Sequence, residues 1–113
     1  MEHKMRLYDE PFNQILNDVK HYEYRLNDEK RKLINIGDTI EFRKVSDESK
    51  TLRVKVLDLL HYDTMTEMFK DTFDDYLYKY YDTPEDASKD TKIYSKEEIQ
   101  EYGCLAIKIE KIL

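Results

Sequence analysis

Several features that mark other classes of protein are scarce or missing in this sequence. Its 113 residues include only two glycines, two prolines, one cysteine and no tryptophan. This scarcity argues against a disordered linker and against a Gly-rich phosphate-binding loop. No stretch approaches the roughly 18 consecutive apolar residues of a membrane-spanning helix. The charged opening MEHKMRLYDE also lacks the apolar segment of a secretory signal.

The single cysteine, Cys104, has no partner for an internal disulfide and lies in an apolar run. We expect it to be an unreactive core residue in a reducing, cytoplasmic setting, with no membrane partner. The histidines and the cysteine do not show the spacing of metal ligands. We therefore expect no metal and no cofactor.

Basic residues are outnumbered, which limits the kind of nucleic-acid contact the protein can make. The chain has 19 basic and 25 acidic residues, giving a net charge of −6. Broad attraction to phosphate backbones needs a basic face and is disfavoured. Most lysines and arginines lie in residues 1–62, whereas residues 63–102 are strongly acidic. An anionic ligand is therefore expected to bind to the first half of the chain.

Apolar and polar residues alternate in five segments, which predicts five strands. The strands are expected at residues 3–7, 20–26, 39–45, 51–62 and 104–113. A phase shift near Asp58 indicates a bulge or bend in the fourth strand. The polar segments 46–50 and 83–91 are expected to be loops.

Three or four helices are predicted around these strands. Asp9 and Pro11 are typical of a helix start, and that helix should end near residue 18. A second helical region begins at about residue 64. Ser95 and Glu98 form a capping box for a last helix, which Gly103 ends. Without a βαβ rhythm, the order of elements predicts one α+β domain over residues 1–113, with its strands curled into a partly closed barrel.

Three charged residues around the second predicted strand are the main candidate site. Glu23 and Arg25 are two residues apart on a strand, so they share a face and can pair. Arg25 offers a planar fork to a phosphate or to a base edge. Lys20 has the opposite parity, but a twist at the turn could bring its long side chain to the same cleft.

Each of these residues has a functional and a structural interpretation. Lys20 could hold phosphate as a point charge or, if desolvated, act as a base or nucleophile. Glu23 could accept a hydrogen bond from a base amine or take part in proton transfer. The rival interpretation is a structural Glu23–Arg25 ion pair that braces the barrel, with Lys20 solvated on the surface.

The segment DVKHYEYR at residues 18–25 resembles the ASCH family signature Gly-x-Lys-x-x-Glu-x-Arg. Lys20, Glu23 and Arg25 match the signature. Asp18 replaces its glycine, at a helix-to-strand turn where aspartate tolerates unusual backbone angles better than most residues. The fragments NIGDTIEF and YSKEEIQEYGCLAIKI also resemble this family, which is related to PUA-type RNA-binding barrels.

The resemblance implies a PUA-like, five-stranded, mostly antiparallel β-barrel with flanking helices and a cleft lined by Lys20, Glu23 and Arg25. It also implies binding of RNA or of a modified nucleotide, and hydrolysis in some members. One branch deacetylates N4-acetylcytidine with the motif lysine and a threonine at the position of Glu23. This chain departs from that branch, because an ionised carboxylate only accepts hydrogen bonds whereas a hydroxyl also donates them.

Aromatic residues and histidines supply the remaining candidates. The chain has ten tyrosines, and tyrosine rings can stack on bases. Tyr76 and Tyr80 follow a helical apolar stripe and are expected to pack in the core. Tyr94, just before the last helix, is the tyrosine expected in the cleft. His61, at the end of the long strand, is a better candidate for ligand contact than His21.

Three functional hypotheses follow from the sequence, and the oligomeric state stays open. The first is a binding module that holds RNA, a nucleotide or a nucleoside through Lys20, Glu23, Arg25, His61 and Tyr94. The second is a hydrolase that acts on a modified nucleoside or on RNA, with Lys20 and Glu23 as catalytic residues. The third is an acidic protein-interaction domain.

Overall fold

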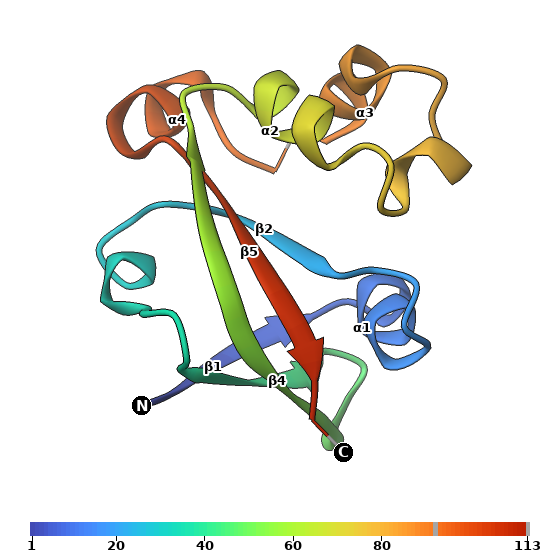
Figure 1. The fold of residues 1–113 in the computed structure, drawn as a ribbon, viewed down its shortest axis with the longest axis vertical. Coiled ribbons are helices and arrows are strands. Elements are labelled where there is room, and N and C mark those ends of the chain that lie inside the picture. The colour runs from blue at the N-terminus through green and yellow to red at the C-terminus, as the bar shows by residue number, and fades with distance from the viewer. Residues whose placement is uncertain (92, 113) are drawn as a thin grey trace.

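A curled sheet of five strands organises the molecule, as the computed structural model shows for residues 1–91 and 93–112 (Figure 1). In chain order the strands are β1 (Glu2–Leu7), β2 (Tyr22–Leu26), β3 (Thr39–Lys44), β4 (Asp47–Tyr62) and β5 (Cys104–Lys111). Their order in the sheet is β1-β3-β4-β5-β2. The β1–β3 pair is parallel, and the other three pairs are antiparallel. The predicted α+β fold with a mostly antiparallel, barrel-like sheet is confirmed.

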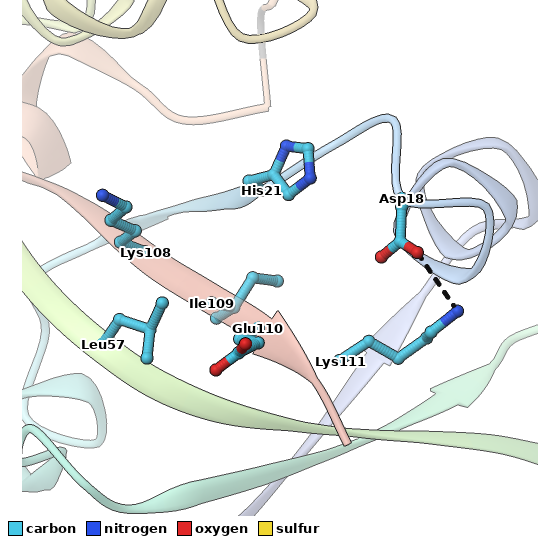
Figure 2. Close-up of a pocket in the computed structure, with 7 residues that line it drawn as sticks. All are labelled: Asp18, His21, Leu57, Lys108, Ile109, Glu110 and Lys111. Atoms are coloured by element: carbon cyan, nitrogen blue, oxygen red, sulfur yellow. Dashed lines mark ion pairs between the residues drawn. The ribbon is translucent and has the colours of Figure 1, made fainter. Parts of the chain in front are cut away.

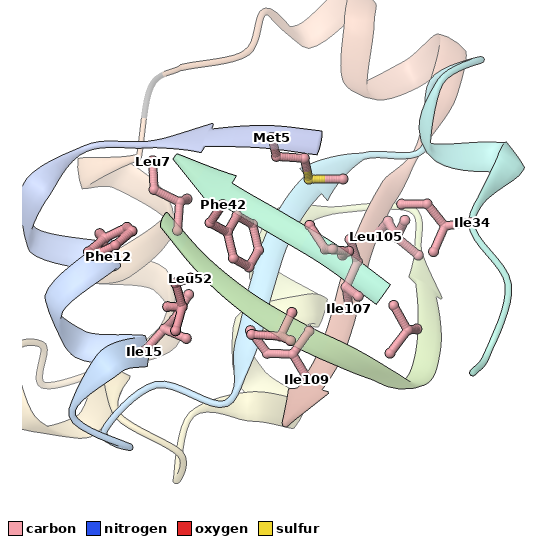
Figure 3. Packing of buried hydrophobic residues seen from close by; sticks show 13 residues of the cluster. Met5, Leu7, Phe12, Ile15, Ile34, Phe42, Leu52, Leu105, Ile107 and Ile109 are labelled. Carbon is pink, nitrogen blue, oxygen red and sulfur yellow. The ribbon is translucent and has the colours of Figure 1, made fainter. Parts of the chain in front are cut away.

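The concave side of the sheet encloses a cluster of apolar side chains, the barrel core (Figure 3). Alternation along the strands produces it: Ile40 and Phe42 of β3 and Val54 and Val56 of β4 are all fully buried. Helix α1 (Asp9–Leu16) adds apolar residues to this cluster. The complete set is Met5, Leu7, Phe12, Ile15, Ile34, Ile40, Phe42, Leu52, Val54, Val56, Leu105, Ile107 and Ile109.

A second apolar cluster lies under the other helices. These are α2 (Met65–Thr72), α3 (Pro84–Asp90) and α4 (Lys96–Tyr102), which Figure 1 shows gathered beyond one end of the sheet. Short 3₁₀ turns, η1 (Arg31–Leu33) and η2 (Leu77–Lys79), complete the structure. The second cluster contains Met65, Met68, Phe69, Leu77, Ala87, Cys104 and Ala106, with several tyrosines packed against it. Strand β5 contributes to both clusters, and its first four residues, 104–107, are buried on both faces.

Two predicted loops are wrong. Residues 83–91 contain helix α3, which Thr83 caps by accepting a hydrogen bond from the backbone N–H of Asp86. The hairpin between β3 and β4 turns at residues 45–46, and Lys44 already pairs with Asp47. Polar composition hid both features, because α3 buries only Ala87 and the start of β4 is exposed.

Other local predictions are confirmed. The register of β4 against β5 shifts between Val56 and Asp58, which is the expected bulge. Ser95 and Glu98 form the capping box of α4, and Gly103 ends that helix with a φ of 75°. Leu113, the predicted end of the last strand, lies outside the described residues. Within the described residues, no helix is long and apolar enough to cross a membrane.

Candidate functional site

Lys20, Glu23 and Arg25 meet in one ion-paired group, here named the triad. The Nζ atom of Lys20 lies 3.1 Å from Oε1 of Glu23. The Nε and Nη2 atoms of Arg25 donate to Oε2 of Glu23 at 3.1 and 2.8 Å. Lys20 and Glu23 are only 6% and 4% exposed, whereas Arg25 is partly exposed. The sequence expectation that these three side chains converge therefore agrees with the geometry.

The turn between α1 and β2 brings Lys20 to this group. Asp18 has a φ of +59°, in the left-handed region that the glycine of the family signature adopts readily. The backbone N–H groups of Val19 and Lys20 both bond to the carbonyl of Gln14. Because β2 begins only at Tyr22, Lys20 is not bound by the alternation of the strand and can reach the face of Glu23.

Glu23 is fully occupied as an acceptor. Its Oε1 atom receives hydrogen bonds from Lys20 and from the backbone N–H of Tyr24, and its Oε2 atom receives both bonds from Arg25. Burial acts to raise the pKa of this carboxyl, but the charges and hydrogen bonds of Lys20 and Arg25 outweigh it, and the pKa is lowered. Glu23 thus stays ionised and holds two cations in place.

Lys20 lies between this carboxylate and two aromatic rings. Its Nζ atom is 5.5 Å from the ring centroid of Tyr24 and 5.5 Å from that of Tyr76, which is the range of a cation–π contact. Burial is the largest single influence and acts to lower the pKa of Lys20. Glu23 and Tyr76 together outweigh it, so the pKa is raised. Lys20 therefore carries a proton at neutral pH and acts as a hydrogen-bond donor.

The triad lies in a cleft of about 480 Å³ between the ends of β1, α1, β2, α2 and the segment that includes η2. Six of the lining side chains are tyrosines, and we name this hollow the tyrosine cleft. Tyr24 and Tyr76 are stacked with ring centroids 6.5 Å apart, and Tyr80 meets Tyr76 edge-on at 6.1 Å. The tyrosines are Tyr8, Tyr24, Tyr76, Tyr80, Tyr81 and Tyr94.

Tyr94 lies in the tyrosine cleft, as the sequence analysis expected. Burial raises the pKa of its hydroxyl, while the nearby charges of Arg25 and Arg31 oppose that rise. Tyr76 and Tyr80, expected only as core residues, line the cleft as well, and Tyr76 also packs against the second apolar cluster. The sequence pattern did not predict that Tyr76 and Tyr80 line the cleft. Helix α2 ends at Thr72, and the chain turns before it reaches these two tyrosines.

His61 lies elsewhere. It is exposed on β4 and lines a separate hollow of about 260 Å³ together with Tyr62 and Cys104. Burial raises the pKa of the Cys104 thiol, which fits an unreactive core residue. The structure therefore does not bring His61 to the triad.

A further hollow of about 430 Å³ lies beside the end of β5 (Figure 2). Its two lysines, Lys108 and Lys111, are matched by Asp18 and Glu110, and Lys111 pairs with Asp18 at 3.5 Å. His21, the other histidine of the sequence analysis, borders this hollow and bonds through Nδ1 to Asp75 at 2.7 Å. Because the positive and negative charges around this hollow balance, it has no preference for an anion.

Metal chemistry finds no support in the described part of the chain. Over residues 1–91 and 93–112, no group of three or more histidine, cysteine, aspartate or glutamate side chains is arranged to hold a metal ion. The triad offers instead two fixed cations and one ionised carboxylate, beside a wall of aromatic rings. Such a set suits a ligand that combines hydrogen-bond acceptors or negative charge with a flat ring.

The chain is similar to a known domain family and to solved structures. The sequence profile of the ASCH domain matches residues 5–113, a span that includes the triad. The crystal structure of the archaeal hypothetical protein PH0355 matches with a TM-score of 0.85 and 33% identity, covering 99% of this chain and 100% of that one. The solution NMR structure of PF0455 from Pyrococcus furiosus matches with a TM-score of 0.76 and 32% identity, covering 99% and 98% of the two chains. No functionally curated protein matches the chain significantly.

Proposed function

This chain belongs to the ASCH domain family, and from that premise we propose that it binds a nucleotide, free or within a short single-stranded RNA, in the tyrosine cleft. The observation that carries the proposal is the triad: two protonated side chains held by one carboxylate on the floor of an aromatic cleft. The net charge of the triad is +1, in a protein whose net charge is −6. The attraction for an anion is thus local.

The hydrogen-bonding capacity of the triad favours a ligand that accepts. A lysine ammonium has three N–H donors and an arginine guanidinium has five. Glu23 takes one bond from Lys20 and two from Arg25, and the backbone carbonyl of Arg6 takes another from Arg25 at 2.9 Å. Donors therefore remain for phosphate or carbonyl oxygens. Glu23, by contrast, has no oxygen to spare for a base amine.

The aromatic wall suits the base of the nucleotide. Tyr8 and Tyr80 line the cleft and are 70% and 54% exposed. Exposed rings that border a cationic floor are the usual platform for an unpaired base. A nucleotide would place its phosphate near Lys20 and Arg25 and its base against one of these rings.

The protonation states of Lys20 and Glu23 favour binding over the hydrolase alternative. A general base works best with a pKa near the working pH, whereas the pKa of Lys20 is raised and that of Glu23 is lowered. A panel of modified nucleosides that includes N4-acetylcytidine, read by mass spectrometry, separates the two functions. Turnover by the wild type that Lys20→Ala abolishes would favour the hydrolase.

Binding is tested by titrating the protein with the four ribonucleoside 5′-monophosphates and following affinity by calorimetry and NMR. Loss of one stacking ring costs about 1–3 kcal/mol, so Tyr80→Ala should weaken the best ligand by roughly tenfold. Tyr78→Ala is the matched control, because Tyr78 is similarly exposed, at 51%, but does not line the cleft. The proposal fails if no monophosphate binds, or if both variants weaken binding equally. In the second case the ligand lies outside the cleft.

A further inference from the structure

We infer that the tyrosine cleft binds a single nucleotide and gains little or no affinity from a continuing RNA strand, because carboxylates at its mouth repel the phosphates of further nucleotides. This inference rests on the proposed nucleotide-binding function and narrows it to a ligand with one phosphate group. It concerns the charges around the triad rather than the triad itself.

Charge is distributed unevenly between the floor and the mouth of the cleft. Six charged side chains line it, three cationic and three acidic: Arg6, Glu10, Lys20, Glu23, Arg25 and Asp90. The triad forms the buried floor, with a net charge of +1. The other three side chains belong to exposed residues at the mouth.

Among the described side chains at the mouth, the negative charges outweigh the positive one. Arg6, its only cation among the described residues, forms an ion pair with Glu48. Glu10 and Asp90 form no ion pair within the described part of the chain, and we name them the mouth carboxylates. A ligand that extends out of the cleft therefore meets two carboxylates that pair with none of the described cations.

The two mouth carboxylates act on the same part of the rim. Asp90 accepts a hydrogen bond from the hydroxyl of Tyr81 at 2.6 Å. That bond, together with burial and the charges of Asp90 and Glu10, raises the pKa of Tyr81 to about 12. Glu10 comes from α1 and Asp90 from the end of α3, two helices on the same side of the molecule in Figure 1.

A strand that continues beyond the cleft would gain nothing from its extra phosphates. Binding of single-stranded nucleic acid strengthens with each phosphate that meets a cation, and each such contact adds about 0.7 to the slope of log affinity against log salt. Here the floor has cations for one phosphate group, whereas Arg6, the one cation described at the mouth, is already paired with Glu48. The cleft thus matches a mononucleotide.

The test compares the best-binding ribonucleoside 5′-monophosphate with the 5′-phosphorylated homotrinucleotide of the same base, at several salt concentrations. We expect the trinucleotide to bind no more than about threefold tighter, with a salt slope below about 1, because only one phosphate group is held. Binding of the trinucleotide at least tenfold tighter, with a slope near 2, would overturn the inference and leave the proposed function standing.

Charge-removing variants test the mouth directly. The double variant Glu10→Gln, Asp90→Asn should tighten the trinucleotide by about three- to fivefold at low salt and change the monophosphate less, as expected for charges separated by water. The control, Glu97→Gln with Glu101→Gln, removes the same charge from the exposed surface of α4, outside the cleft. Equal effects of the two double variants would overturn the role of the mouth. If neither the monophosphate nor the trinucleotide binds the wild type, the proposed function and this inference both fail.

Discussion

Two clusters of the described residues, each built around one carboxylate, differ in their surroundings. In the triad, Glu23 lies between Lys20 and Arg25. In a second group, the Asp38 cluster, the carboxylate accepts from His3 Nε2 at 2.8 Å and from the amino group of Met1 at 3.3 Å. The backbone N–H of Asn35 also donates to Asp38, at 3.0 Å. Both carboxylates have a lowered pKa.

Of these two clusters, the triad lines one of the three hollows described above. Asp38 and His3 line none of the three hollows described above, and Asp38 follows Gly37, whose φ of 94° makes the turn into β3. The backbone carbonyl of Asp38 also accepts from Val56, which ties this turn to β4. The Asp38 cluster thus ties the turn before β3 to β1 and β4. The comparison teaches that a charged cluster becomes a candidate site through the cleft and the rings beside it.

Removing the charge of the central carboxylate should lower the free energy of unfolding more in the triad than in the Asp38 cluster. This is the largest difference that we expect between the two. Glu23→Gln leaves Lys20 buried without its counter-charge, and breaking a buried pair in this way costs about 3–5 kcal/mol. Urea denaturation should show this loss, and a smaller one for Asp38→Asn, because its cationic partner, the amino group of Met1, belongs to a largely exposed residue. Lys20 should also lose its raised pKa in Glu23→Gln, because burial then dominates. Equal losses in the two variants would break the comparison.

Ligand-induced stabilisation should depend on one cluster only. At ten times its Kd, a bound monophosphate stabilises the folded state by about 1.4 kcal/mol. Wild type and Asp38→Asn should gain this amount in thermal denaturation. Arg25→Gln, which keeps the Lys20–Glu23 pair, should gain less at the same ligand concentration. A gain in Arg25→Gln equal to that in Asp38→Asn would remove the triad from the ligand site.

The smallest expected effect is the loss of stability when acid protonates Asp38. Its hydrogen bonds to His3 and to Asn35 lower the pKa of Asp38 from 3.8 to about 2. The folded state therefore binds this proton less readily than the unfolded chain does. The stability it contributes is present above about pH 4 and is lost as the pH falls through 2. The difference in melting temperature between wild type and Asp38→Asn should shrink over that interval. A constant difference would mean that Asp38 does not titrate there.

Much of the fold could be predicted because the alternation of apolar and polar residues along a strand decides which side chains are buried. Ile40 and Phe42 alternate with polar neighbours, and these two side chains fill the barrel core. Helix α3 escaped prediction although Thr83 and Pro84 are ordinary start signals, because it buries one residue and so has almost no apolar stripe. The cap provided by Thr83 was enough to form this helix in spite of its polar composition.

The site was predictable only in part. The spacing of Lys20, Glu23 and Arg25, with the family resemblance, identified the floor of the cleft. Its wall depends on tertiary placement: Asp75 bonds to the backbone and ring of His21 and so fixes the segment that holds Tyr76 over Lys20. His61 was misleading because it lies on β4, and β5 separates β4 from β2 in the sheet.

The position of β2 at the end of the sheet also determines when the cleft can form. Strand β2 is hydrogen-bonded to β5, and Tyr22 pairs with Lys108, near the other end of the chain. During synthesis on the ribosome, residues 20–25 emerge long before the strand that fixes them. Bringing such distant segments together requires closing a long loop, which slows folding. A nascent chain therefore cannot assemble the tyrosine cleft until strand β5 has been made.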